Sequence, residues 1–442
     1  MKKYETLSRR WGKAAIYAGA FAGMAMLSPL AVAAKAPLGF GQGVKGGEGG
    51  VVIEVTTAAE LEKALCDPKK LSGDKRVCSD SSPRIIKIKG IIDYNAPELR
   101  EMATSGGCYY ADEEVCIAKG VPAKEWDLLV ADKSSYNGHC KGHTGVDQIK
   151  YNNLGLKPLA IGSNTTVMGV GKNSGIKGRG FAVRNASNVI IRNLSITDIN
   201  EGIVFVGDGI LLENADKVWI DQNYISRIGR QWITLGYAKT TNVTISDNDF
   251  DGTSKQGKSC NQAHAYGLYV AGKNQSVTIV GNWFRNFRSR APIVMPPDGD
   301  GPAPVVHMAN NYFEHGTWHG LDAYKPARVL VEGNYYEDVQ TPIMRYPDSD
   351  SKGQNAGYVF APLATEKQLC KSKLKRECTA NLVFKANPKP YCLTVEKAFT
   401  LDANVLDAMK VAADGKSVFK AYPAKNVPRR VKAEAGPQDW LR

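Results

Sequence analysis

The stretch Val218-Trp219-Ile220-Asp221-Gln222-Asn223-Tyr224-Ile225 is the first of five copies of one pattern, in which apolar residues alternate up to an asparagine and resume after it. The other copies occupy residues 243–250, 277–284, 306–313 and 329–336. One such strand cannot bury its apolar face alone, so copies at this spacing predict strands stacked as the coils of a solenoid. The pattern therefore predicts an all-β fold, a single-stranded parallel β-helix.

The asparagine of each copy is predicted to be structural. Asparagine tolerates the left-handed conformation that such a turn needs, and identical amides stacked coil on coil can hydrogen-bond along the column. We therefore assign no catalytic role to Asn223, Asn248, Asn282, Asn311 and Asn334.

Residues 1–33 have the composition of a secretion signal. Five basic residues precede or open an apolar run over 14–33, which ends in the small-residue cleavage pattern Ala31-Val32-Ala33. A membrane-spanning helix is the alternative, and Gly19, Gly23 and the cleavage pattern argue against it. We expect a soluble, secreted protein, extracellular or periplasmic.

The charge of the remaining chain indicates an anionic partner. Removing the signal takes away five positive charges and one negative charge, so the formal net charge falls from +13 to +9. Nucleic acid, a membrane surface and an acidic polysaccharide would all suit this balance. The expected export, together with the lack of a zinc-finger spacing or an aromatic nucleic-acid signature, favours the polysaccharide. We predict no nucleic-acid partner, no membrane partner and a monomer.

All nine cysteines follow residue 33, so export would expose them to oxidising conditions. The count predicts four disulfides and one spare thiol. Cys66 with Cys78, and Cys370 with Cys378, are each close enough to close a local loop, and spacing leaves the other pairings open. No pair has metal-finger spacing, which favours a structural role.

The sequence divides after the signal into a β-helix domain over 34–345 and a C-terminal extension over 346–442. Within the first, a capping Thr57 and a helix-forming run predict a helix that covers the open end of the solenoid. Between 95 and 154 the periodicity disappears and three cysteines appear, which indicates a long disulfide-pinned loop.

In the extension, we expect the coils to stop after Tyr346. A lysine-rich tail, helical over 401–412, should then wrap back over the barrel.

One strand of each coil lies outside the repeated pattern. Aligning these strands places Asp208, Arg230 and Arg290 on one outward face, because stacked coils lie about 4.8 Å apart. An acid and two arginines suit a carboxylated chain, since guanidinium matches planar carboxylates. A surface ion pair beside a solvated arginine is the alternative. Both arginines stand where a turn enters a strand, which favours the functional role.

The motifs that carry a family resemblance are Gly39-Phe40-Gly41, Asp198-Ile199-Asn200, Gly207-Asp208-Gly209-Ile210, Ile228-Gly229-Arg230-Gln231, Ser289-Arg290-Ala291-Pro292 and Glu332-Gly333-Asn334. With these motifs in order over residues 37–345, the chain resembles the pectate/pectin lyase family of right-handed parallel β-helices, and most of all its pectin lyase branch. The resemblance also implies the disulfides Cys116–Cys260, Cys108–Cys140 and Cys370–Cys378.

The resemblance implies a β-elimination, in which a base removes the C5 proton of a galacturonosyl unit and the glycosidic oxygen leaves from C4. Arg290 matches the family's catalytic arginine, the proposed base. Because a guanidinium is essentially never neutral, a role in stabilising the enolate stays open. Arg230 matches the arginine that stands in pectin lyases where pectate lyases place calcium ligands, and Asp208 would orient and neutralise it.

A methyl-esterified substrate would need no divalent ion, because its α-proton is already more acidic than that of a carboxylate and fixed arginines can stabilise the enolate. We therefore expect no metal and no cofactor. Asp208 and Asp221 are the alternative calcium ligands, and Arg230 beside them would repel the ion.

Several aromatic and histidine residues are predicted to bind substrate. Where pectin lyases line the cleft with tryptophans, this chain offers Phe205 and Tyr266, and Gln222 replaces a customary histidine. Fewer tryptophans and more lysines indicate a partly de-esterified substrate. The further candidates are Tyr109, Tyr110, Trp126 and His319. Packing within the loop is the alternative for the three aromatics. For His264, His315 and His319 near the groove, a role as acid or base is weighed against a packed or surface role, which is commoner for a lone histidine.

The predicted function is that of a secreted pectin lyase, which cleaves methyl-esterified homogalacturonan without calcium and gives unsaturated oligogalacturonides. The first alternative is a calcium-dependent pectate lyase acting on de-esterified polygalacturonate. A hydrolase is weaker, because the sequence lacks the clustered aspartates that hydrolysis needs. A non-catalytic glycan-binding β-helix is the third alternative.

Overall fold

The computed structural model describes residues 35–73, 76–131, 139–295, 302–344, 357–386, 392–393, 403–415 and 418–439. Residues 36–442 form one compact unit. The predicted secretion signal, residues 1–33, lies outside the described residues. In the ranges given above, no helix is long and apolar enough to cross a membrane.

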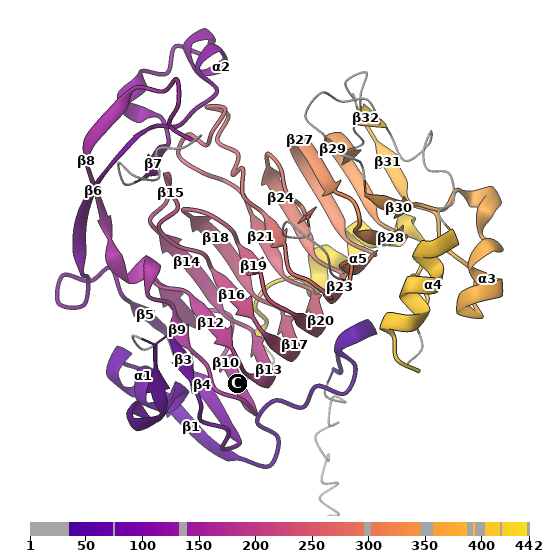
Figure 1. Ribbon diagram of the computed structural model, residues 1–442, viewed down its shortest axis with the longest axis horizontal. Helices are drawn as coiled ribbons and strands as arrows, with labels where there is room; N and C mark the ends of the chain where they lie inside the picture. Colours follow the sequence, from indigo (N-terminus) through magenta and orange to yellow (C-terminus); the bar gives the residue numbers. More distant parts are fainter. Residues whose placement is uncertain are drawn as a thin grey trace, which may run out of the picture. The chain divides into compact units, whose positions relative to one another are not determined.

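A ten-stranded parallel sheet forms one side of every coil (Figure 1). It contains the first strand of each repeated pattern, and its order follows the sequence. Its strands are β1 (Val51–Val55), β4 (Arg84–Ile88), β10 (Thr165–Gly169), β13 (Ser187–Arg192), β17 (Ala215–Asp221), β20 (Thr240–Ser246), β23 (Ser276–Val280), β26 (Val305–Ala309), β28 (Arg328–Glu332) and β30 (Tyr358–Phe360).

A second sheet supplies the other two sides as two rows of parallel strands that meet at β27 (Tyr312–Ala323). The first row contains the strands that follow the asparagines: β5 (Ile91–Asp93), β11 (Gly175–Lys177), β14 (Ser195–Ile199), β18 (Tyr224–Ile228), β21 (Asp249–Asp251) and β24 (Trp283–Phe287). The second row, which carries the arginines, contains β9 (Leu159–Ala160), β12 (Phe181–Arg184), β16 (Ile210–Glu213), β19 (Ile233–Leu235), β22 (Leu268–Val270) and β25 (Ile293–Val294). Beyond β27 lie β29 (Tyr335–Met344) and β31 (Leu382–Phe384). The predicted parallel β-helix is confirmed.

The core of the barrel is built from equivalent residues of successive coils. Phe250, Phe284, Phe313 and Tyr336 stack along one column, with successive ring centroids 4.9, 4.8 and 4.6 Å apart. All four side chains are fully buried. Because parallel pairing fixes the spacing of the coils, a residue type that packs well in one coil packs well in the next.

The predicted asparagine ladder is present. Each side-chain amide donates to the next side-chain oxygen at 2.9–3.0 Å, in the order Asn223, Asn248, Asn282, Asn311, Asn334. The prediction of the left-handed residue was wrong by one position. The residues with positive φ are those that precede the asparagines: Gln222, Asp247, Gly281, Asn310 and Gly333. The ladder residue itself must aim its amide inward, along the column.

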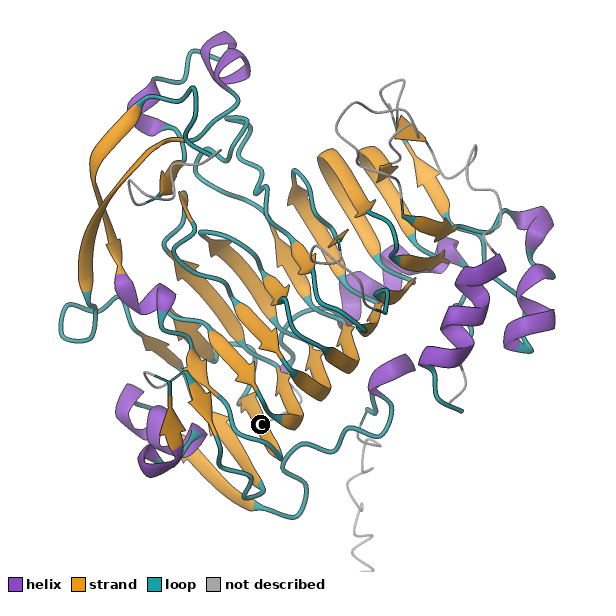
Figure 2. Cartoon of the chain, viewed as in Figure 1, coloured by secondary structure: helices purple, strands orange, loops and turns teal. Residues whose placement is uncertain are grey.

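The N-terminal helix predicted from Thr57 is α1 (Ala58–Leu65). The Thr57 hydroxyl accepts from the Glu60 amide, and the Glu60 carboxylate accepts from the Thr57 amide, so a capping box closes the first turn. Leu61 and Leu65 are buried in the main core. The helix therefore covers part of the apolar core of the first coils, and Figure 2 shows it beside the first strands of the barrel.

The excursion over 95–154 is more ordered than the sequence predicts. Strands β6 (Met102–Tyr109) and β8 (Gly145–Asn152) pair antiparallel, β7 (Leu128–Val130) pairs with β6, and β15 (Ile203–Val204) of a barrel loop pairs with β7. The short helix α2 (Glu113–Ala118) lies in the same region. The excursion is thus a small sheet joined by backbone hydrogen bonds to a loop of the β-helix.

The prediction that the coils stop after Tyr346 was wrong. Strand β30 pairs with β28, and β31 pairs with β29, so residues of the extension add another coil. Asn381 also extends the ladder, since the Asn334 amide donates to its side-chain oxygen at 3.0 Å. This coil lacks the Val-x-Ile run before its asparagine, so the repeat search did not find it.

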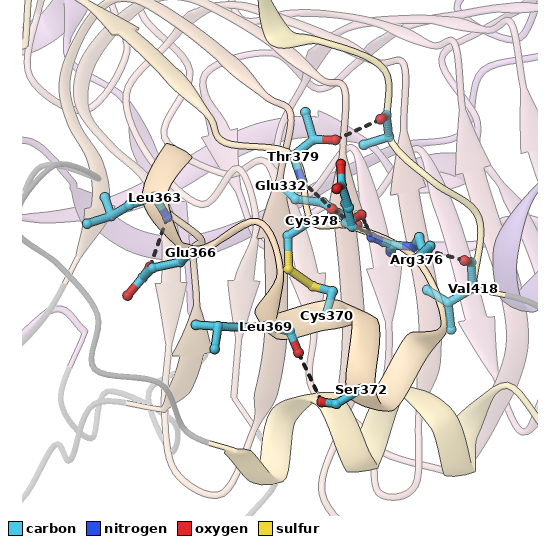
Figure 3. Close-up of a disulfide and its surroundings, with 12 residues drawn as sticks. Glu332, Leu363, Glu366, Leu369, Cys370, Ser372, Arg376, Cys378, Thr379 and Val418 are labelled. Carbon is cyan, nitrogen blue, oxygen red and sulfur yellow. Dashed lines mark hydrogen bonds and ion pairs between the residues drawn. A yellow bond between two sulfur atoms is a disulfide. The ribbon is translucent and has the colours of Figure 1, made fainter.

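The remaining tail packs on the β-helix. Helix α3 (Leu369–Leu374) leads to Arg376, whose guanidinium donates to the buried Glu332 of β28 at 2.9 Å (Figure 3). Helix α4 (Ala403–Ala412) confirms the helix predicted over 401–412 and packs on β26 and β28. Helix α5 (Val427–Glu434) packs on Tyr312. The predicted wrapping tail is confirmed in these described parts.

Four disulfides cross-link the unit: Cys66–Cys78, Cys108–Cys140, Cys116–Cys260 and Cys370–Cys378. The first closes the hairpin of β2 (Leu71–Ser72) and β3 (Val77–Cys78), and the third ties the excursion to the barrel. All the predicted pairings are confirmed. The ninth cysteine, Cys392, begins β32 (Cys392–Leu393), and its side chain lies outside the described residues.

We predict that Asn248→Ala destabilises the protein by about 3 kcal/mol, because it removes the buried acceptor of the Asn223 backbone and side-chain amides and the buried donor to Asn282 and to the Ile220 carbonyl. Guanidinium unfolding followed by circular dichroism measures the loss. Asn173→Ala, at an exposed asparagine, is the control and should change stability by less than about 0.5 kcal/mol. Equal losses in the two variants would contradict a stabilising ladder.

Candidate active site

The structure places Asp208, Arg230 and Arg290 just before strands β16, β19 and β25 of one row. The Arg230 amide donates to the Gly207 carbonyl at 3.1 Å, so Asp208 and Arg230 lie in adjacent coils. The Leu268 amide donates to the Arg290 carbonyl at 2.7 Å, so the coil of β22 separates Arg230 from Arg290. The two arginines are therefore two coils apart on the same side of the barrel.

Asp208 is held by the next coil. Its carboxylate accepts from the Gln231 amide at 3.0 Å and from the Thr234 hydroxyl at 2.9 Å. Burial opposes the charge of Arg230, but the Asp208 carboxylate and the Tyr237 hydroxyl favour it, and the pKa of Arg230 is raised. Arg230 is thus a fixed cation whose counter-charge is anchored by backbone and side-chain donors.

The Arg230 guanidinium is only partly satisfied by the protein. It lies over the Phe205 ring, with the central carbon 5.2 Å from the ring centroid. Its Nε is buried and has no hydrogen-bond partner. A buried donor without a partner costs free energy, which an acceptor on a ligand would recover.

Arg290 is held by Tyr266 and Gln231. Its guanidinium lies over the buried Tyr266 ring, 5.0 Å from the centroid. In the amide orientation that satisfies its neighbours, Gln231 donates to the Gly267 carbonyl at 3.2 Å and accepts from Arg290 at 2.9 Å. Gln231 thus contacts both sides of the site, since its backbone amide binds Asp208.

Two tyrosines complete the site, and the sequence analysis missed both. Tyr269, on β22, is close enough to Arg230 and Arg290 for each to lower its pKa, although burial raises the pKa of Tyr269 to about 12 overall. Tyr237 stands edge-on to Tyr269, with ring centroids 6.1 Å apart, and is 56% exposed. Tyr269 could have been found, because it is the outward-facing residue between two buried residues of β22. Tyr237 lies in a turn, where the alternation of a strand gives no prediction.

A cavity of about 140 Å³ opens beside the first arginine, and we call it the arginine cavity. Its walls include Phe205, Asp208, Arg230, Leu211 and Arg184. The cavity combines a guanidinium with apolar surface. Such walls suit a ligand group that has one polar atom beside an apolar part.

His264 lies beneath the backbone of Arg230 and Tyr266, and its side chain does not line the arginine cavity. Its Nε2 lies 2.7 Å from the Arg230 carbonyl oxygen and 2.9 Å from the Tyr266 carbonyl oxygen, so this nitrogen carries the hydrogen. Burial, with a smaller contribution from Arg290, lowers the pKa of His264 to about 4. The neutral ring therefore fixes the backbone of both residues. His315 is exposed and pairs with Asp338.

The structure does not bring the other predicted substrate-binding residues into the arginine cavity. Trp126 donates to the Val121 carbonyl at 2.9 Å and packs with the Cys116–Cys260 disulfide, inside the excursion. His319 is 3% exposed, next to Trp318.

Tyr110 packs partly against Tyr266, with the Lys258 ammonium 4.3 Å from its ring centroid. Tyr109 is half-buried in β6. Tyr110 is thus the aromatic of the excursion that the structure links to the residues beneath Arg290.

The arrangement does not fit calcium, which prefers six to eight oxygen ligands. Within the described residues, no group of three or more histidine, cysteine, aspartate or glutamate side chains could hold a metal ion. Both Asp208 oxygens already accept hydrogen bonds. Asp221, the predicted alternative ligand, lies in the other sheet and is ion-paired with Arg192 at 3.1 Å. Asp208 and Asp221 therefore do not form a common site, and the alternative of calcium held by these two carboxylates is not supported.

Comparison with known proteins places the chain in a family. A family model described as pectate lyase matches residues 141–383. Probable pectin lyase E from Aspergillus fumigatus is 35% identical over 401 residues, which is 90% of this chain and 94% of that protein. Probable pectin lyase F from Neosartorya fischeri is 33% identical over 404 residues, with 90% and 94% covered. The chain belongs to the pectate lyase family, which confirms the resemblance found in the sequence.

Solved structures agree on the fold. A pectate lyase from Bacillus sp. N165 in complex with trigalacturonate superposes with a TM-score of 0.53 at 19% identity, covering 91% of this chain and 98% of that one. A pectate lyase from Acidovorax avenae subsp citrulli gives a TM-score of 0.54 at 17% identity, covering 96% and 99%. At these identities the likeness concerns the fold alone.

We predict that His264 makes a contribution to stability that is lost as the pH drops from about 6.5 to 4. In this window His264 becomes protonated in the unfolded chain. In the folded protein it stays neutral, because burial lowers its pKa. The full effect is about 3 kcal/mol, and His264→Gln, which keeps a donor toward Arg230, should reduce it. Urea unfolding at several pH values measures the slope. The exposed His315→Gln should leave the slope unchanged, and a wild-type slope in His264→Gln would refute the assignment.

Proposed function

We propose that this protein is a secreted pectin lyase, which cleaves methyl-esterified homogalacturonan by β-elimination and releases unsaturated oligogalacturonides. The observation that carries the proposal is the placement of Arg230 and Arg290, two coils apart on one side of the barrel, with Tyr269 near both guanidinium groups. The relatives that align over most of their length are named probable pectin lyases, and this supports pectin as the substrate.

Arg230 is assigned to the carbonyl oxygen of the substrate ester. Its buried Nε lacks a partner, and a donor already in place costs no reorganisation when charge develops on that oxygen. Asp208 is assigned the role of holding Arg230 in position, since it is itself fixed by Gln231 and Thr234. The apolar walls of Phe205 and Leu211 suit the ester methyl group.

Arg290 is assigned the role of the base that removes the C5 proton. The proton passes to the guanidine nitrogen, the C5–H electron pair becomes the C4–C5 double bond, and the C4–O bond breaks. The leaving oxygen takes a proton from water, and the hydroxide that forms takes the C5 proton from Arg290 and regenerates the base. Only the minor unprotonated form of a guanidine can accept a proton, so this role requires the rate to rise with pH in the alkaline range.

Secretion is part of the proposal. The four disulfides are typical of proteins that mature in oxidising compartments, and the N-terminal segment has the composition of a secretion signal. A pectin-degrading enzyme must also meet its polymer outside the cytoplasm.

We expect the purified protein to convert highly esterified pectin to products that absorb in the ultraviolet as unsaturated uronides, with and without a chelator. Arg290→Lys should lower kcat by at least about 100-fold, because a flexible ammonium does not reproduce the planar contact with Gln231 and Tyr266. Arg328→Lys, whose arginine lies over Tyr358 away from the site, is the matched control and should keep its rate.

Absence of ultraviolet product from every pectin tested would end the proposal of a lyase. Loss of activity with a chelator, restored by calcium, would select a calcium-dependent pectate lyase. A rate that does not change with alkaline pH would show that Arg290 is not the base. Its remaining role would be to stabilise the enolate.

A further inference from the structure

The arginine cavity continues into a larger one. A second cavity of about 450 Å³ shares Pro158 with it, and the segment 154–158 contributes to the walls of both. We call this second space the distal cavity. It lies toward β9, three strands from the strand of Arg230, or roughly 14 Å at the spacing of paired strands. A polymer that crosses the strands of this row would therefore extend from one cavity into the other.

The walls of the distal cavity are polar and carry more positive than negative charge. Arg76, Lys157 and Arg179 face Glu62 and Glu101. Arg179 pairs with Glu62 at 2.7 Å, and Lys157 pairs with Glu101. Both carboxylates are about half exposed, and such surface pairs contribute little free energy. A carboxylate on a ligand can therefore take their place at modest cost.

One buried hydroxyl in the distal cavity has no partner. Tyr94 is 1% exposed, and its hydroxyl, which lies beside Arg179 and Glu62, makes no hydrogen bond of normal geometry to either. The Arg179 guanidinium lies 5.2 Å from the centroid of its ring. An unpaired buried hydroxyl destabilises the protein alone, so an acceptor or donor on a ligand would be favoured there.

The walls of the two cavities differ in chemistry and are joined. Phe205 and Leu211 give the arginine cavity apolar surface, whereas three cations and a hydroxyl line the distal cavity. Arg184, a wall of the first, donates to the Arg76 carbonyl at 3.3 Å, and Arg76 is a wall of the second. The Cys66–Cys78 disulfide closes the hairpin that carries Arg76.

We propose that the distal cavity is a subsite for an unesterified galacturonate unit, so that the enzyme prefers pectin in which a free acid lies a few sugars from the ester it cleaves. Arg76 and Lys157 pair with the free carboxylate, and Tyr94 hydrogen-bonds the same sugar. This inference rests on the proposed function for the reaction, while the binding of a free uronate stands apart from it.

The first experiment measures binding without turnover. Calorimetric titration with unesterified trigalacturonate should give an affinity that falls with salt, and its methyl ester should bind at least about fivefold more weakly. The double variant Arg76→Gln/Lys157→Gln and the single variant Tyr94→Phe should each weaken binding of the free acid at least about threefold. Tyr94→Phe removes only the unpaired hydroxyl, so a purely structural tyrosine would tolerate it.

The second experiment measures selectivity. The ratio of kcat/KM on partly de-esterified pectin to that on fully esterified pectin should fall at least about fivefold in the double variant. Lys410→Gln, which removes an exposed charge on α4, should leave the ratio at the wild-type value. An unchanged ratio and unchanged binding of trigalacturonate in the double variant would overturn the subsite. Binding that responds to the variants in a protein that forms no unsaturated product would uphold the subsite and reject the lyase.

Discussion

Parallel pairing between successive coils is the constraint on which the rest of the structure depends. It places each residue one strand spacing from its equivalent in the next coil, so that a column of identical side chains becomes a continuous interaction. The buried amides of the asparagine ladder and the stacked aromatic rings both use this spacing. The same register brings Asp208, Gln231, Tyr266 and Arg290 to one side of the barrel, although they lie far apart in sequence.

Much of the fold is predictable from the sequence because the repeat is itself the physical unit. A pattern that alternates and then turns at an asparagine has few ways to bury its apolar face. The prediction was wrong where the pattern stops but the coil continues, at Asn381, because backbone pairing needs no particular side chain. The sheet of β6 and β8 was missed for a related reason, since its burial comes from loop contacts and has no regular alternation.

The candidate site was predictable to the extent that it follows the columns. Asp208, Arg230 and Arg290 were found because each enters an equivalent strand. Gln231 was missed because its role comes from orientation: its side-chain amide joins the Gly267 carbonyl to the Arg290 guanidinium. His264 was weighed as a packed residue, but the two carbonyl oxygens on either side of its ring nitrogen were not foreseen. No single-residue signal distinguishes such groups from ordinary polar residues of a turn. Asp221 shows the opposite case, a residue that is near in sequence and lies in a different sheet.

Residues 436–439 return to earlier coils of the barrel. The Gln438 amide donates to the Asn193 side chain, the Gly436 amide donates to the Asp247 carbonyl, and Asp439 pairs with Lys172, whereas α4 of the same tail packs on β26 and β28. In an array where each coil contacts only its neighbours, unravelling can begin at either end. A strap that spans distant coils removes this freedom, so the two ends of the stack must come apart together. A stack held in this way resists proteases that attack fraying termini, without adding anything to its core.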